Sequence, residues 1–124
     1  MPKCEINLDA SPIFKRLISK YQPKYPRLID DFTDVFSRIE QDFRTAAHAA
    51  AVPKFSQTIW KYRCKCSDRR EGASGGIRIL AYYNASTNVL YPLTFYFKRD
   101  MENMPDKDIQ QIIDEFKKAV DDIN

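Results

Sequence analysis

The alternation of side chains from Trp60 to Cys66 constrains the fold more than any other part of the sequence. Uncharged residues take every second position, namely Trp60, Tyr62, Cys64 and Cys66. Cations fill the positions between them, namely Lys61, Arg63 and Lys65. Because successive side chains of a β-strand point to opposite faces of the sheet, this pattern predicts a half-buried strand with a cationic exposed side. A row of cations on a rigid sheet is suited to binding anions such as phosphate.

Further strands are predicted on both sides of this one. Apolar and polar residues alternate at 3–8, which indicates a short strand. Two longer strands are expected at 77–83 and 89–98, joined by a polar hairpin loop. Pro92 lies in the last strand and cannot donate a hydrogen bond to a neighbouring strand, so we expect a β-bulge or an unpaired position there.

Three amphipathic helices complete the predicted set of elements. Ser11 followed by Pro12 is typical of a helix start, and a second helix is expected at 27–50 and a third at 105–124. Their apolar residues recur at helical spacing. These are Phe14, Leu17, Ile18 and Tyr21 in the first helix, Leu28, Phe32, Val35, Phe36, Ile39 and Phe43 in the second, and Ile109, Ile112, Ile113, Phe116 and Val120 in the third.

The predicted order of elements is β-α-α-β-β-β-α. It is typical of an α+β fold in which a small, mostly antiparallel sheet packs on a hairpin of two helices. The chain has 124 residues, no internal repeat and no Ser/Gly/Pro-rich linker, so we expect a single domain, 1–124.

Charge is distributed unevenly along the chain. Residues 54–99 contain nine Lys or Arg against two acids, a net charge of +7, whereas residues 100–124 contain eight acids against three lysines, a net charge of −5. The total of +3 hides this polarity. Such asymmetry favours a nucleic-acid or phosphate surface beside an acidic flank, although the charges are also compatible with plain solvation of exposed faces.

Cysteine and histidine usage predicts neither disulfides nor a metal. Cys64 and Cys66 are two apart on a strand, Cys4 is left over, and His48 is the single histidine. We therefore expect three reduced thiols in a cytoplasmic protein, with no metal and no small-molecule cofactor. A leader segment and a membrane span of about 20 apolar residues are not expected either.

Four segments in this order resemble the RelE/ParE superfamily of toxins from type II toxin-antitoxin modules, and its RelE/HigB-like branch more closely. They are the opening strand followed by SPIFKRLISKY, the strand WKYRCK, the turn and strand SGGIRILAYY, and the strand and tail LTFYFKRDMENMPDKDIQQII. Their family counterparts read like a KSGG-x-R turn and a YxKNEKEDLSxxE tail. The resemblance covers most of the chain and implies a RelE-like fold of the microbial ribonuclease type.

The resemblance also implies a function and partners. Family members of this branch use a concave basic sheet to enter the ribosomal A site and cut mRNA, and each is neutralised by a cognate antitoxin protein. We therefore expect a ribosome-dependent mRNA endoribonuclease that inhibits translation. Two alternatives remain open, namely a ParE-like inhibitor of DNA gyrase and a catalytically degenerate module of the same fold that only binds.

The chemistry of RNA cleavage limits which residues are needed. RNA carries its own nucleophile, the 2′-hydroxyl, so a protein must align it, neutralise the phosphate and move protons. Arg63 and Arg78 match basic family positions and are expected to clamp the phosphate if their strands pair. Lys98 matches the family lysine before the acidic tail, and neighbouring arginines are expected to lower its pKa, which makes it the predicted general acid or base.

Other residues are predicted to bind RNA without taking part in the chemistry. These are Lys61, Lys65, Arg69, Arg70, Arg99 and Tyr96. Tyr96 and Phe97 alternate faces, so only one of them can be presented to a base. The turn departs from the family pattern because Glu71 and Ala73 stand where lysines are common, and either Arg69 or Arg70 substitutes for them or activity is reduced.

Several of these residues also have a purely structural interpretation. Arg78 is compatible with an ion pair to Asp30 or Asp31, and Lys98 with a solvated strand end. His48 is expected on the surface of the second helix. The third helix is either a movable acidic element that covers the basic sheet or part of the core.

Overall fold

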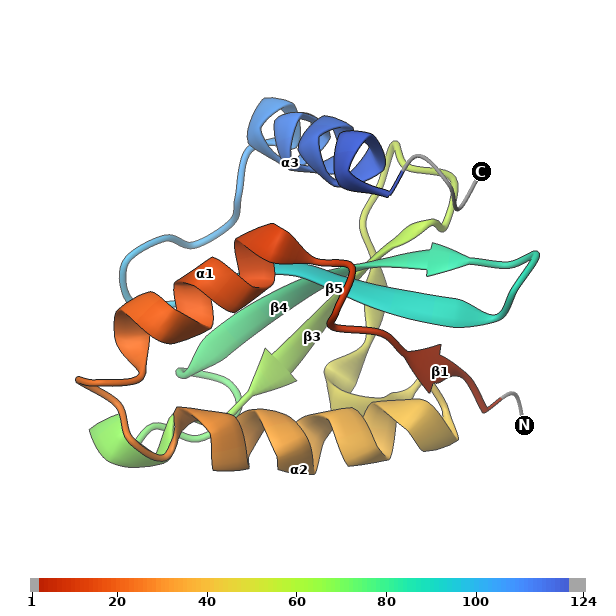
Figure 1. The fold of residues 1–124 in the computed structure, drawn as a ribbon. Helices are drawn as coiled ribbons and strands as arrows, with labels where there is room; N and C mark the ends of the chain where they lie inside the picture. Colours follow the sequence, from red (N-terminus) through yellow and green to blue (C-terminus); the bar gives the residue numbers. More distant parts are fainter. Residues whose placement is uncertain (1–2, 121–124) are drawn as a thin grey trace.

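The structure, a computed structural model, describes residues 3–120. Within them the chain forms one five-stranded sheet, three α-helices and two short 3₁₀ helices (Figure 1). The elements are β1 (Glu5–Ile6), α1 (Pro12–Tyr21), α2 (Leu28–Gln41), η1 (Ala46–His48), β2 (Ala50–Ala51), β3 (Ile59–Cys64), η2 (Ser67–Arg69), β4 (Ile77–Asn84), β5 (Val89–Phe97) and α3 (Asp106–Ala119). The predicted α+β class is therefore confirmed.

The strands lie in the order β1-β5-β4-β3-β2. β1 runs parallel to β5, and the other neighbours are antiparallel. The sheet is thus mostly antiparallel, as predicted. The predicted order of elements lacked β2, a two-residue edge strand whose Ala50 and Ala51 pair with Lys61 and Trp60. A strand this short has no period of its own to be recognised in a sequence.

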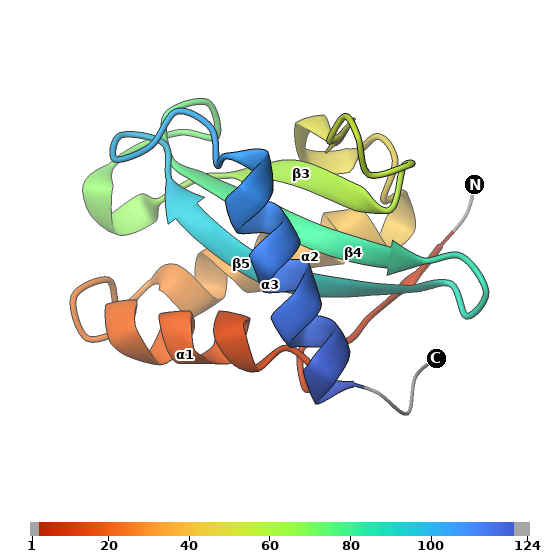
Figure 2. The ribbon, with the colours of Figure 1, turned by 90° about the horizontal axis from the view of Figure 1, so that it is seen from above.

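The helices cover the two faces of the sheet unequally. α1 and α2 run antiparallel and pack on one face, while α3 crosses the other face (Figures 1 and 2). Tyr62 and Cys64 of β3 point into the core with α1 and α2, which confirms the apolar side of the predicted strand. Phe95 lies at the centre of this core, with ring centroids of Phe14 and Phe32 at 5.2 and 4.9 Å.

α3 is part of the second core. Its Ile109, Ile113 and Phe116 are buried against the sheet beside Leu80 and other residues of β4 and β5. Of the two interpretations of this helix, packing as core is the one that the contacts support. The helix predicted at 105–124 is observed at Asp106–Ala119, and its last predicted residues, 121–124, lie outside the described part of the chain.

The prediction that α2 reaches residue 50 is wrong, because the helix ends at Gln41. Asp42 is extended, with φ −161° and ψ 90°, and its carboxylate accepts a hydrogen bond from the backbone N–H of Arg44 at 3.2 Å. The turn directs Phe43 into the core, where it is fully buried and stacks on Tyr83 with ring centroids 4.1 Å apart. Burial of this aromatic ring outweighs the helix propensity of the following alanines.

The two proline-related predictions are confirmed in position. The register between β4 and β5 shifts at Leu80/Ala81, opposite Pro92, which is the expected bulge. Ser11 precedes α1 and Pro12 occupies its first turn. The side chain of Ser11 makes no capping hydrogen bond, so proline alone marks this helix start.

Candidate nucleic-acid interface

α3 leaves part of its face of the sheet open, and cations gather there. Arg63 of β3 and Arg78 of β4 are direct partners in the antiparallel register, and Tyr96 of β5 is the next partner beyond Arg78. Directly opposed residues project from the same face of a sheet. The two arginines predicted to clamp a phosphate are therefore side by side.

These arginines line a pocket of about 280 Å³, which we call the cationic pocket. Its lining residues are His48, Ala50, Lys61, Arg63, Arg78, Lys98, Glu102 and Asn103. The structure thus brings together all three predicted catalytic residues and one of the predicted RNA-binding lysines. They come from β3, β4 and the loop after β5, which are distant in sequence and adjacent in the sheet.

Arg78 is held by the turn that precedes its own strand. The side chain is buried, and its guanidinium donates to the carbonyl oxygens of Ala73 at 3.0 Å and Ser74 at 2.8 Å. A guanidinium has five N–H donors, so others remain for a ligand. Neutral carbonyls fix its position without cancelling its charge.

The alternative in which Arg78 pairs with a carboxylate of α2 is wrong. Asp31 instead accepts hydrogen bonds from the backbone N–H and the hydroxyl of Ser67, at 2.8 and 2.6 Å. Within residues 3–120, Arg78 makes no ion pair. The Asp31 carboxylate therefore anchors η2 and is not the partner of Arg78.

The turn needs glycine at position 76. A Cβ added to Gly76 would lie 2.5 Å from the carbonyl oxygen of Cys64 and 2.9 Å from that of Gly72. Backbone approaches this close exclude a side chain. Gly76 therefore allows the turn to fold back on the end of β3, and this places the carbonyls that hold Arg78.

Crowding of like charges changes the acid–base properties of the pocket. The pKa of Lys61 is lowered, first by burial and then by the positive charges of Arg78, Arg63 and Lys98, with Glu102 acting in the opposite direction. Burial and Arg63 also lower the pKa of Arg78. Cations held together against their repulsion are typical of an anion-binding site.

The two lysines of the pocket have different partners. Lys61 Nζ donates to Asn103 Oδ1 at 3.1 Å, a neutral contact. Lys98 Nζ pairs with the carboxylate of Glu102 at 3.0 Å, and the Glu102 side chain is 77% exposed. Lys98 therefore has an acid as its direct partner, whereas the direct partner of Lys61 is neutral.

Arg69 does not reach the cationic pocket. Its guanidinium lies 5.0 Å from the ring centroid of Phe97, on the side of the sheet that α1 and α2 cover, and it forms an ion pair with Glu71 at 3.4 Å. Arg99 pairs with the same carboxylate. Glu71, which departs from the family pattern, thus joins Arg69 of the turn to Arg99 after β5. The RNA-binding role expected of Arg69 does not fit its position.

The other predicted RNA-binding residues lie outside the cationic pocket. Lys65 and Arg70 are exposed on the surface beyond its lining residues. Tyr96 is on the open face and Phe97 in the core, so only Tyr96 is presented on this side, as expected. Tyr96 is nevertheless only 7% exposed, so most of its ring is covered by neighbouring side chains.

Four residues that line the pocket were not predicted as site residues, namely His48, Ala50, Glu102 and Asn103. His48 was expected on a helix surface, but it belongs to η1 and has a positive φ of 55°. The pairing of Ala50 with Lys61 carries this segment to the rim. Glu102 and Asn103 lie in the tail that resembles the family. Acids and asparagines are frequent in loops, so the sequence alone did not mark these two as site residues.

Residues 3–120 contain no group of three or more His, Cys, Asp or Glu side chains arranged to hold a metal ion. All three cysteines are free and buried. No helix of the described chain is long and apolar enough to cross a membrane. In comparisons with known proteins, no family model matches this chain and no curated protein matches it.

Proposed function

We propose that this protein is a ribosome-dependent mRNA endoribonuclease, the toxin of a type II toxin-antitoxin module. The observation that carries the proposal is the convergence of Lys61, Arg63, Arg78 and Lys98 on one open pocket of the sheet. Such a pocket fits a phosphate of a polynucleotide backbone better than a neutral ligand. The resemblance of four segments to the RelE/HigB-like branch is the basis for proposing mRNA cleavage and its dependence on the ribosome.

The reaction is a transesterification within the RNA strand. The 2′-oxygen attacks the adjacent phosphorus, a new P–O2′ bond forms and the P–O5′ bond breaks. One proton leaves the 2′-hydroxyl and one is delivered to the departing 5′-oxygen, so the products are a 2′,3′-cyclic phosphate and a 5′-hydroxyl. Arg63 and Arg78 neutralise the charge that builds up on the phosphate oxygens.

Proton transfer falls to Lys61 in this arrangement rather than to Lys98. Its lowered pKa makes the neutral amine more accessible, and a neutral amine can accept the 2′-hydroxyl proton. His48 lines the same pocket, and histidine is the commonest general acid or base in enzymes. We assign Lys61 and His48 the two proton transfers, and we assign Lys98 charge stabilisation at the rim.

The proposed partners follow from the same charges. A cytoplasmic protein that cuts mRNA requires inhibition, and a cognate antitoxin with an acidic or amphipathic segment would cover the cationic pocket. That segment and RNA would compete for the same cations, so binding of the antitoxin would block the active site. No small-molecule cofactor enters the proposed chemistry.

The proposal is tested by adding the purified protein to a translation reaction with a defined mRNA and mapping the 5′ ends. We expect cuts in the translated region, and Arg63→Gln is expected to slow them by about 10²-fold, the cost of removing one charge-stabilising donor. The matched control is Arg38→Gln on α2, an exposed arginine that pairs with Asp34 and does not line the cationic pocket.

The remaining outcomes separate the alternatives. Intact mRNA with loss of supercoiling by DNA gyrase would replace the proposal with a ParE-like function. Intact mRNA and unaffected gyrase, with no growth arrest on expression, would leave a degenerate binding module. Equal cleavage rates of the wild type and Arg63→Gln would show that the cationic pocket does not take part in cleavage.

A further inference from the structure

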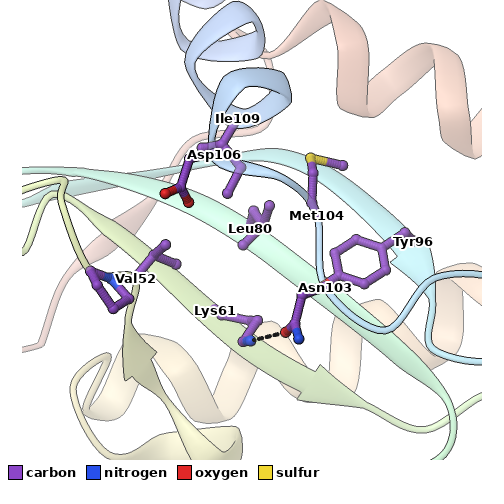
Figure 3. A pocket seen from close by; sticks show the side chains of 9 residues that line it. Val52, Lys61, Leu80, Tyr96, Asn103, Met104, Asp106 and Ile109 are labelled. Carbon is purple, nitrogen blue, oxygen red and sulfur yellow. Dashed lines mark hydrogen bonds between the residues drawn. The ribbon is translucent and has the colours of Figure 1, made fainter.

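A second hollow lies next to the cationic pocket, beneath the start of α3. Figure 3 shows it between the open face of the sheet and the loop that leads into the helix. Its volume is about 180 Å³. Lys61 and Asn103 line both hollows, and the hydrogen bond between them stands at the boundary.

The walls of this second hollow are mostly apolar. Leu80 and Ile109 are 2% and 3% exposed, and the ring of Tyr96 forms one side. Figure 3 shows these side chains around the space, with Leu80 on its floor. An apolar slot with an aromatic wall suits a flat ring.

The polar side chains at its edge are Lys61, Asn103 and Asp106, and the first two are hydrogen-bonded to each other. Asp106, at the start of α3, lines the hollow. Among residues 3–120 its carboxylate pairs only with Lys54, at 3.4 Å, and the two side chains are 50% and 77% exposed. An ionised carboxylate can only accept hydrogen bonds. It therefore favours a ring that carries an amino group.

On the basis of the proposed RNA-cleaving function, we infer that this hollow is a nucleobase subsite that selects an amino-bearing base over uracil. A nucleotide joins a phosphate to a flat heterocycle, and the two adjacent hollows match these two parts. The phosphate lies among the cations, and the base enters the apolar slot beside Tyr96. Adenine and cytosine present exocyclic amino groups to Asp106, whereas uracil presents a carbonyl oxygen at the equivalent position.

The test measures binding of short oligonucleotides that cannot be cleaved because every 2′-oxygen is methylated. Fluorescence anisotropy with labelled oligo-A, oligo-C and oligo-U is expected to give about tenfold tighter binding of the first two. Asp106→Asn is expected to abolish this preference, since an amide can donate as well as accept. Asp108→Asn is the matched control, because it removes the same charge from the same helical turn without lining the hollow.

A second variant blocks the space instead of changing its polarity. Val52 lines the hollow from the loop after β2 and is only partly buried, so Val52→Trp fills it at small risk to folding. We expect this variant to bind all three oligonucleotides with the weaker affinity of oligo-U.

The outcomes distinguish this inference from the proposed function. Equal affinity of the wild type for all three oligonucleotides would overturn the base subsite, even if translated mRNA is still cut. A preference that survives both Asp106→Asn and Val52→Trp would place base selection elsewhere and overturn it too. A preference lost in both variants supports the subsite whether or not cleavage is detected.

Discussion

Gly76 is the most demanding position of the turn that holds Arg78, and replacing it with alanine should destabilise the fold. The new Cβ would lie 2.5, 2.9 and 3.0 Å from backbone atoms of Cys64, Gly72 and Cys66. Backbone atoms cannot swing aside as a side chain can, so the end of β3 or the turn must move by roughly half an ångström. We expect Gly76→Ala to lower the free energy of unfolding by about 3 kcal/mol, the upper range for overpacking.

The sequence provides its own controls, because its other two glycines lie in the same turn. A Cβ at Gly72 or Gly75 meets no atom within 4 Å, and neither residue has a positive φ. Alanine at these positions is expected to be neutral or to stabilise by up to about 1 kcal/mol through the unfolded chain. Urea unfolding followed by the fluorescence of Trp60, the single tryptophan and 8% exposed, measures all three variants.

The expected difference is large compared with experimental error. For a chain of this size, 3 kcal/mol corresponds to a midpoint of thermal unfolding that is lower by roughly 10 °C. If the free energies of unfolding of Gly76→Ala and Gly75→Ala agree within about 0.5 kcal/mol, the turn does not approach β3 closely in solution. The turn would then not hold Arg78 in the way described.

Three further predictions concern buried polarity and charge. Tyr62→Phe removes a hydrogen bond from the buried hydroxyl to the carbonyl oxygen of Phe43 at 2.7 Å, and should cost about 1 kcal/mol in urea unfolding; no loss would mean that water replaces the bond. Lys61→Met should raise the free energy of unfolding at neutral pH. The pKa of Lys61 is lowered from 10.5 in the folded state, which means that the folded protein disfavours the charged amine, and methionine removes that charge. This destabilisation of the wild type disappears as pH rises from the folded-state pKa of Lys61 to 10.5, so the stability gained by Lys61→Met should shrink over that pH range. A gain in stability that does not depend on pH would contradict the electrostatic cause. Arg63→Gln should reduce the salt dependence of single-stranded RNA binding, with the slope of log affinity against log salt falling by about 0.7, and an unchanged slope would show that Arg63 contacts no phosphate.

The sequence was sufficient for features that depend on local periodicity. The alternation from Trp60 to Cys64 placed aromatic and thiol side chains in the core and cations on the other face, as observed. The bulge at Pro92 followed from a missing N–H donor. The helical stripes of α1, α2 and α3 were found because packing of an amphipathic helix leaves a period of 3.6 residues.

The sequence was not sufficient where distant residues compete for the same partner. Asp31 was a reasonable partner for Arg78 on charge alone, but Ser67 occupies its carboxylate in the fold. Arg69 was grouped with the RNA-binding cations, yet it packs over Phe97 on the opposite side of the sheet. Neither outcome can be read from spacing, because both depend on which loops meet after the strands have paired.

The amino-acid sequence by itself determined which faces of the elements are apolar and which are cationic, since side-chain direction in strands and helices follows from backbone geometry. Tertiary structure alone decided that α2 stops at Gln41 so that Phe43 can be buried, and that His48 consequently reaches the rim of the cationic pocket. The physical reason is that a core position for one aromatic ring stabilises the folded chain more than a further turn of exposed alanine helix does.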